Sequence, residues 1–245
     1  MITKSLIYIF CLFLLSLNTY SLDLSSERIL VFAAHPDDEI IGCGGSIAKY
    51  AKAGKQVSII YLTSGDAGSQ KYDKKTLAKL REAEAKNAAK TLGIKEENLY
   101  FLHQPDGFLE ENSEVLIKVT ELIKQIKPNI AYIPQAEEAH SDHKNTNKIA
   151  LKAINKARGN WFQEAKGEPW NIRQILAYEI YPLMTEVQYC EDIKPYFDLK
   201  MKAIKQHLTQ IESVRYDLLI EAINTYRTTM NGNGECFKIL KTDKI

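Results

Sequence analysis

The chain has no surplus of charge of either sign and few cysteines. Lysine plus arginine number 32 and aspartate plus glutamate 31 among 245 residues. A protein that binds nucleic acid through its surface usually carries a basic balance, so we expect no nucleic-acid partner. The four cysteines include no C-x-x-C pair, which argues against a cysteine-rich zinc site. A Cys190–Cys236 disulfide is compatible with the spacing, but we do not expect it, and Cys43 is interpreted as a small buried hydrophobe.

The chain also lacks internal repeats and low-complexity linkers after Leu22. Hydrophobic residues make up 45% and charged residues 26%, which is ordinary for a globular protein. Disorder, collagen and coiled coil are therefore excluded as descriptions of the whole chain. We expect residues 22–245 to form one domain, and no pattern specifies its oligomeric state.

The first 21 residues are typical of a secretory signal peptide. Lys4 is followed by the mostly apolar run Leu6–Leu17, and the small residues Thr19 and Ser21 precede a plausible cleavage point. The run is shorter than the ~20 residues of a membrane span. We therefore expect a secreted or periplasmic protein with no stable membrane association once the signal is cleaved. The alternative is a protein anchored in the membrane by an uncleaved signal.

Short apolar runs alternate with helical patterns along the rest of the chain. The predicted strands are Ile29–Ala34, Val57–Leu62, Leu99–Leu102, Ile130–Pro134, Gln174–Tyr181 and Cys236–Leu240. The predicted helices are Ser46–Ala53, Thr76–Leu92, Glu114–Ile126, His143–Ala157, Leu199–His207 and Glu212–Tyr226. This order predicts an α/β fold with a mostly parallel sheet and helices on both faces. Loops at the carboxyl ends of its strands are then the expected place for an active site.

A dense cluster of ionisable side chains follows the first predicted strand. His35, Asp37, Asp38 and Glu39 come directly after an apolar run. His35 and Asp38 are spaced i, i+3, so both can converge on one point in a tight turn that Pro36 stiffens. A capping aspartate would explain a lone Asp-Asp pair, but not a preceding histidine at the end of a buried strand. We therefore expect a functional site here.

A second cluster, His140-Ser141-Asp142-His143, follows the predicted strand Ile130–Pro134. This loop should open at the same edge of the sheet as His35 and Asp38. Imidazole and carboxylate are suitable zinc ligands, and a catalytic zinc site keeps an open position for water. Together the two clusters predict a metal site.

These residues resemble the PIG-L / LmbE-like deacetylases. Ala34–Glu39 matches the family's A-H-P-D-D-E motif, and His140–His143 matches its H-x-D-H motif. Weaker matches follow in family order: Thr63–Gly68 with Asp66 in place of Glu, the helix Arg81–Gly93, the turn Pro105–Gly107, and Gly234–Phe237 with Gly in place of Ala. The resemblance implies a Rossmann-like three-layer sandwich and a zinc-dependent N-deacetylase acting on N-acetylglucosamine conjugates.

The resemblance also implies roles for individual residues. His35, Asp38 and His143 would be the zinc ligands. Asp37 would be the general base, and a protonated His140 would stabilise the tetrahedral intermediate. The remaining implied roles are the orientation of His140 by Asp142 and sugar contacts by Arg81 and Asp106. Either Asp37 or His140 could donate the proton to the leaving amine.

Several rival interpretations stay open. A glycoside hydrolase could use two carboxylates such as Asp37 and Glu39 without a metal. A nucleotide-binding Rossmann enzyme is disfavoured because Gly42–Gly45 lacks the full G-x-G-x-x-G pattern. Two further interpretations are a metal-dependent hydrolase of another amide or ester, and a non-catalytic sugar- or metal-binding protein on this fold. Zinc is the expected metal, although the same donors would accept Fe²⁺ or Co²⁺.

Overall fold

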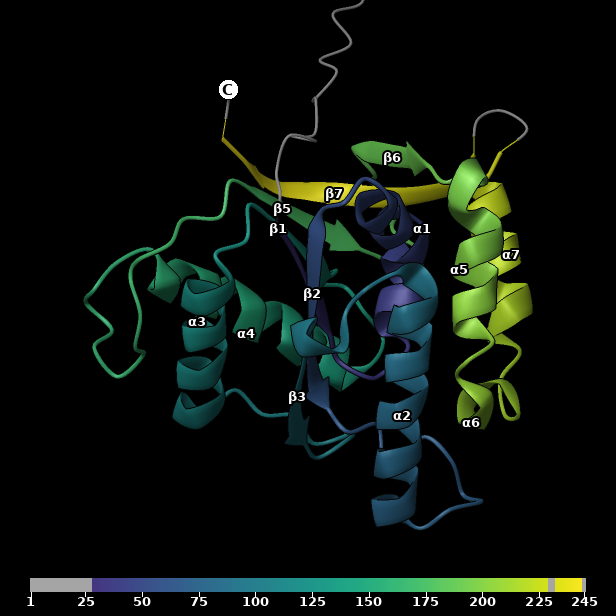
Figure 1. Ribbon diagram of the computed structural model, residues 1–245, viewed down its shortest axis with the longest axis horizontal. Helices are drawn as coiled ribbons and strands as arrows, with labels where there is room; N and C mark the ends of the chain where they lie inside the picture. Colours follow the sequence, from purple (N-terminus) through teal and green to yellow (C-terminus); the bar gives the residue numbers. More distant parts are fainter. Residues whose placement is uncertain (1–27, 229–231, 244–245) are drawn as a thin grey trace, which may run out of the picture.

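A mostly parallel sheet runs through the middle of the molecule. The computed structural model describes residues 28–228 and 232–243, so the expected signal peptide, residues 1–21, lies outside the described residues. Within them the sheet has seven strands in the order β3-β2-β1-β4-β5-β7-β6 (Figure 1). The strands are β1 (Arg28–Ala33), β2 (Gln56–Thr63), β3 (Leu99–Gln104), β4 (Ile130–Pro134), β5 (Gln174–Tyr178), β6 (Tyr189–Asp192) and β7 (Gly234–Thr242).

The first five strands are parallel, and the last two are antiparallel to their neighbours. Val31 of β1, for example, lies opposite Ile59 of β2 and Tyr132 of β4. The parallel strands are continuous apolar runs because helices cover both faces. Alternate residues of β1 therefore enter different cores: Ile29 and Val31 point to one face and Leu30 to the other.

Helices form a layer on each face of the sheet, which confirms the expected three-layer α/β sandwich (Figure 1). On one face lie α1 (Asp38–Lys52), α2 (Lys74–Leu92), α5 (Phe197–Ile204), α6 (Leu208–Ile211) and α7 (Tyr216–Tyr226). On the other lie α3 (Ser113–Ile126) and α4 (Ser141–Ala157). Two short 3₁₀ helices are η1 (Glu96–Asn98) and η2 (Lys194–Tyr196). None of the helices in the described part of the chain has the length and apolar character needed to cross a membrane.

Local signals explain several element ends. The Asp73 carboxylate accepts a hydrogen bond from the Thr76 N–H at the start of α2, and Gly93 ends that helix in the left-handed region with φ 86°. The Asn112 side chain caps α3 in the same way. The helix expected over residues 212–226 begins only at Tyr216, as α7, and the short α6 precedes it. Helix α1 begins at Asp38 rather than Ser46, so Asp38 and Glu39 of the cluster after β1 lie in the first turn of a helix.

Helix α1 is broken at Cys43, whose φ and ψ of −146° and 23° are non-helical. A buried ion pair occupies the break. The Glu235 carboxylate accepts from the N–H groups of Gly45 and Ser46 at 2.7 and 2.8 Å. Lys200 Nζ donates to Glu235 at 2.7 Å and to a main-chain carbonyl oxygen of the first half of α1, at residue 41, at 2.9 Å. These bonds satisfy main-chain groups that the break leaves without helical partners.

The expectation of no disulfide was wrong. Cys190 and Cys236 are disulfide-bonded, and they lie opposite each other in the register of β6 and β7. Strand β6 is the element that the sequence patterns did not indicate, so the pairing that brings the two residues together was also missed. Cys43 is a free, buried thiol, as expected.

Candidate metal centre

The site is built from the loop after β1 and the start of α4, at the carboxyl edge of the sheet. The His35 N–H donates to Asp38 Oδ2 at 2.8 Å, which fixes the i, i+3 turn. Between them Asp37 has φ 156°, an uncommon value for a non-glycine residue. Unusual backbone geometry of this kind concentrates at functional sites because surrounding contacts must hold it.

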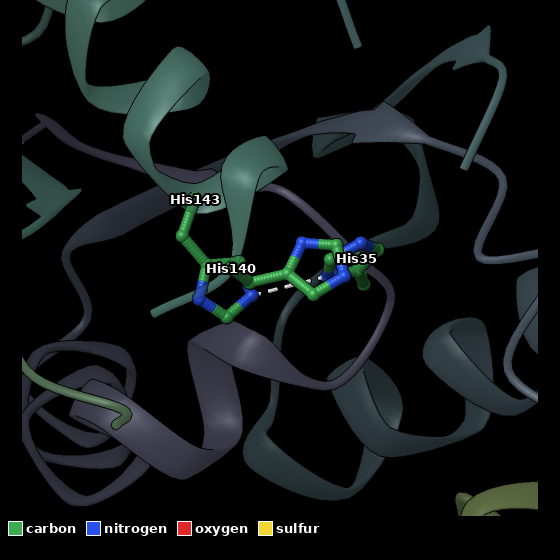
Figure 2. A group of neighbouring side chains, drawn as sticks. All are labelled: His35, His140 and His143. Atoms are coloured by element: carbon green, nitrogen blue, oxygen red, sulfur yellow. Dashed lines mark hydrogen bonds between the residues drawn. The ribbon is translucent and has the colours of Figure 1, made fainter. Parts of the chain in front are cut away.

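His35 Nδ1, His143 Nε2 and the Asp38 carboxylate form a donor triangle. The two nitrogens are 3.1 Å apart. His35 Nδ1 lies 3.5 Å from Asp38 Oδ2, and His143 Nε2 lies 3.4 Å from the other carboxylate oxygen, Oδ1. In a tetrahedral zinc site with metal–donor distances of about 2.0–2.1 Å, neighbouring donors are about 3.3 Å apart. The triangle therefore fits one small divalent cation. Figure 2 shows the two imidazoles converging beside a third, His140.

Carboxylates hold the outer nitrogens of both imidazoles. His143 Nδ1 lies 3.1 Å from Glu138 Oε2. His35 Nε2 lies 3.0 Å from Asp106 Oδ1 and 3.3 Å from Asp142 Oδ2. Metal-binding histidines usually donate their second N–H to such a group, which fixes the tautomer and the ring orientation. The outer contacts thus leave His35 Nδ1 and His143 Nε2 to face the triangle.

Glu138 is a site residue that the sequence analysis missed. Besides contacting His143, its carboxylate accepts from the N–H groups of Ile180 and Tyr181 at 3.0 and 3.2 Å. In the sequence it is only an acidic residue in the loop before the H-x-D-H motif. It is also one of two neighbouring glutamates, and nothing in the sequence distinguishes the two. The neighbouring loop after β5 makes Glu138 a buried partner, and that contact is visible only in the tertiary structure.

The electrostatics favour a cation at the triangle. Burial acts against ionisation of Asp38, but the charge of His143 and hydrogen bonds from His143 and His35 hold its pKa well below the usual range. Burial lowers the pKa of His143, yet the charge of Asp38 and bonds to Asp38 and Glu138 raise it to about 9. The carboxylates therefore create a negative field that attracts either protons or a dication, and metal binding releases the protons.

Asp37 faces Arg81 instead of the triangle. Its Oδ2 lies 3.0 Å from Arg81 Nη2, and the same guanidinium donates to the carbonyl oxygens of Pro36 and Gly65 at 2.9 and 3.0 Å. Burial, opposed by the charge of Arg81, raises the pKa of Asp37 to about 6. Arg81 is buried and also forms part of the cavity wall. It therefore contacts Asp37 in addition to facing the cavity, where a sugar contact was expected. A side chain at Gly65 would collide with the guanidinium, within about 2.5 Å.

His140 caps α4 and is partly open to solvent. Its Nδ1 accepts a hydrogen bond from the Asp142 N–H at 3.2 Å, so Nε2 carries the proton of the neutral ring. Burial, followed by the charges of His35 and His143, lowers the pKa of His140. The protonated His140 that the resemblance implies stays a prediction.

The carboxylate of Asp142 also differs from expectation. It contacts His35 and accepts from the N–H groups of Gly107 and Leu109 at 2.7 and 3.2 Å, while its backbone N–H is the group that bonds His140. Asp106, expected at the sugar, holds His35 and accepts from the Ala67 N–H at 2.9 Å. Both carboxylates therefore orient His35 and the loops around it.

A cavity of about 270 Å³ opens over the triangle. Its wall includes every residue to which the family resemblance assigns a role except Asp142, which contacts His35. Three further lining residues come from late segments: Ile180, Gln210 and Tyr216. No motif in the sequence links these positions to His35. Ile180 reaches the site from the loop after β5, whereas Gln210 and Tyr216 reach it because α6 and α7 lie on the face of the sheet that α1 and α2 cover.

Glu39 does not fit the two-carboxylate rival. Its side chain is fully buried and accepts from the Tyr61 O–H at 2.7 Å. Burial, opposed by that hydrogen bond, raises its pKa to about 8. A glycoside hydrolase needs both carboxylates on either side of the scissile bond, and solvent does not reach Glu39.

Comparison with known proteins gives consistent relatives. The PIG-L family profile, described as GlcNAc-PI de-N-acetylase, matches residues 30–154. The 1D-myo-inositol 2-acetamido-2-deoxy-alpha-D-glucopyranoside deacetylase of Kineococcus radiotolerans is 29% identical over 63% of this chain and 52% of its own length. The diacetylchitobiose deacetylase of Thermococcus kodakarensis is 26% identical over 84% of this chain and 80% of its own length. The chain thus spans about half of the first relative.

A solved structure agrees with the sequence relatives. The N,N'-diacetylchitobiose deacetylase from Pyrococcus horikoshii matches with a TM-score of 0.79 and 26% identity. The alignment covers 88% of this chain and 84% of that one.

Proposed function

This chain belongs to the PIG-L family of GlcNAc-PI de-N-acetylases, and from that premise we propose that it is a metal-dependent hydrolase that removes the acetyl group from an N-acetylglucosamine-containing glycan or glycoconjugate. The observation that carries the proposal is the donor triangle of His35, Asp38 and His143, with Asp37 beside it and outside it. The named activities of the relatives support the substrate class.

The chemistry divides between the metal and the chain. A dication held by the triangle would supply Lewis acidity, which would polarise the acetamide carbonyl and acidify the attacking water. Asp37 takes a proton from that water, and a pKa of about 6 suits a general base near neutral pH. His140 Nε2–H donates to the carbonyl oxygen as negative charge develops there. The C–N bond then breaks, the amine leaves with the proton that Asp37 took from the water, and acetate remains.

Zinc is the proposed metal. Two imidazole nitrogens and one carboxylate oxygen match the ligands of catalytic zinc sites. The same donors also accept Fe²⁺ and Co²⁺, so metal analysis of the purified protein and reconstitution with each ion decide among them.

We also propose that the protein works outside the cytoplasm. The signal-like residues 1–21 and the Cys190–Cys236 disulfide are independent features that support this location, because disulfides persist mainly in oxidising compartments. N-terminal sequencing of the native protein tests it: a start near Leu22 supports export with cleavage. An intact Met1 in the membrane fraction would indicate an anchored form.

An acetate-release screen tests the activity. The metal-loaded protein is incubated with N-acetylglucosamine, chito-oligomers, peptidoglycan fragments and lipid-linked sugars, with a chelated sample as control. Loss of acetate release on chelation and its return with metal are expected. His140→Ala should keep its metal and lose roughly 10²–10³-fold in kcat, as is typical when one oxyanion donor is removed. No acetate from any of these compounds with metal bound would move the substrate to another amide or ester.

A further inference from the structure

Two large aromatic side chains are exposed on residues that directly follow cavity-lining residues in the sequence. Phe108 is 74% and Tyr181 66% exposed. Their chain neighbours Gly107 and Ile180 line the cavity. Exposed apolar surface at a binding cavity is a mark of a ligand-binding groove. We refer to Phe108 and Tyr181 together as the aromatic rim.

The backbone at Phe108 is rigidly held. The N–H groups on either side of it, at Gly107 and Leu109, both donate to the Asp142 carboxylate. Its own N–H donates to the Pro105 carbonyl oxygen at 3.3 Å, which closes the turn. Leu109 is buried while Phe108 is not. The turn therefore holds the aromatic ring at the surface.

The backbone at Tyr181 is held by the other end of the same catalytic segment. Its N–H donates to Glu138 Oε2, and its carbonyl oxygen accepts from the Ala139 N–H at 3.0 Å. Glu138 also contacts His143. One ring is thus tied to Asp142 and the other to Glu138, on the segment that carries His140.

The cavity is small for a glycan. Its volume of about 270 Å³ lies just below the ~300 Å³ at which drug-sized pockets begin, so it has room for one acetamido sugar ring. Any further ring of the substrate must lie outside the cavity, over its edge. Aromatic side chains provide a large rigid contact area there at little entropic cost, and the C–H face of a pyranose is apolar.

We propose that the aromatic rim binds a second pyranose ring of the substrate, so that the enzyme prefers oligosaccharides to a single N-acetylglucosamine. The inference rests on the proposed function and names the substrate class more narrowly. The rim acts on binding of the distal ring, and the metal triangle acts on the acetamide in the cavity.

The test compares N-acetylglucosamine with its β-1,4-linked tetramer. Phe108→Ala and Tyr181→Ala should each lower kcat/KM for the tetramer roughly 2- to 10-fold more than for the monomer, the range of one aromatic stacking contact. Phe108→Trp and Tyr181→Phe, which keep an aromatic ring, should keep the preference for the tetramer over the monomer. Trp161→Ala is the matched control, because Trp161 is 70% exposed and neither Trp161 nor its neighbours in the chain line this cavity.

Titration calorimetry of the metal-loaded protein with both sugars separates this inference from the proposed function. Weaker tetramer binding in the two alanine variants, with monomer binding less affected, supports the rim whether or not acetate is released. Equal losses for both sugars, or losses no larger than those of Trp161→Ala, overturn it. Absence of acetate release overturns the proposed function alone.

Discussion

Substitution of Glu235 by glutamine is predicted to destabilise the protein strongly. Glu235 and Lys200 are fully buried, and their charges are 2.7 Å apart. The variant leaves the Lys200 ammonium buried without a counter-charge, which typically costs about 3–5 kcal/mol in the free energy of unfolding. At about 2–4 °C per kcal/mol for a chain of this size, the melting temperature should fall by about 6–20 °C.

Substitution of the partner residue, Lys200, should lower the free energy of unfolding less. Lys200→Met leaves the Glu235 carboxylate with three donors, from Gly45 N–H and from the N–H and O–H of Ser46. Hydrogen bonds to a charged group are worth about 1.5–3 kcal/mol each, so the remaining anion stays partly compensated. The double variant removes both charges and should recover part of the loss, and the double-mutant cycle measures the coupling.

The ion pair should also affect the metal. It spans the break in α1, and the first half of that helix carries Asp38. Glu235→Gln should therefore weaken metal affinity, measured by competition with a chelator below the melting temperature. Denaturant unfolding at fixed metal concentration gives the stability change. A change under about 1 kcal/mol, or a larger effect of Lys200→Met than of Glu235→Gln, would refute the reasoning.

Three further predictions follow from other contacts. Asp38→Ala should abolish metal binding, whereas Asp37→Asn should keep the metal and lose turnover, because only Asp38 lies in the donor triangle; equal metal loss in both would contradict the assignment. Replacing Cys190 and Cys236 by serine opens a loop with a sequence separation of 46 and should lower stability by up to about 4 kcal/mol, measured by denaturant unfolding against a reduced wild-type sample. His207 is buried with both ring nitrogens unpaired, and burial, then the charge of Arg81, lowers its pKa to about 3. The unfolded chain protonates this ring near pH 6.5, whereas the folded chain keeps it neutral. The free energy of unfolding of the wild type should therefore fall, relative to that of His207→Leu, by about 1.4 kcal/mol per pH unit between about pH 6 and 4. Parallel pH profiles of the two free energies would exclude this.

The sequence by itself determined the central architecture and the edge of the sheet at which the two His/Asp clusters meet. Continuous apolar runs such as Ile29–Ala34 identify buried parallel strands, because side chains on both faces must be covered. The topology of a parallel sheet then brings the carboxyl ends of β1 and β4 to one edge. For this reason the sequence alone predicts that His35 and His143, 108 residues apart in the chain, lie close together.

The tertiary structure alone decided the partners of these residues. Side-chain direction placed Asp37 toward Arg81 and the Asp142 carboxylate toward His35. The edge strand β6 carries too short a pattern to be identified, so the disulfide it forms with β7 was missed. Glu138 has no spacing that distinguishes it in the sequence. Periodicity reports local burial, whereas hydrogen-bond partners between loops depend on how distant elements pack, and only the folded chain contains that information.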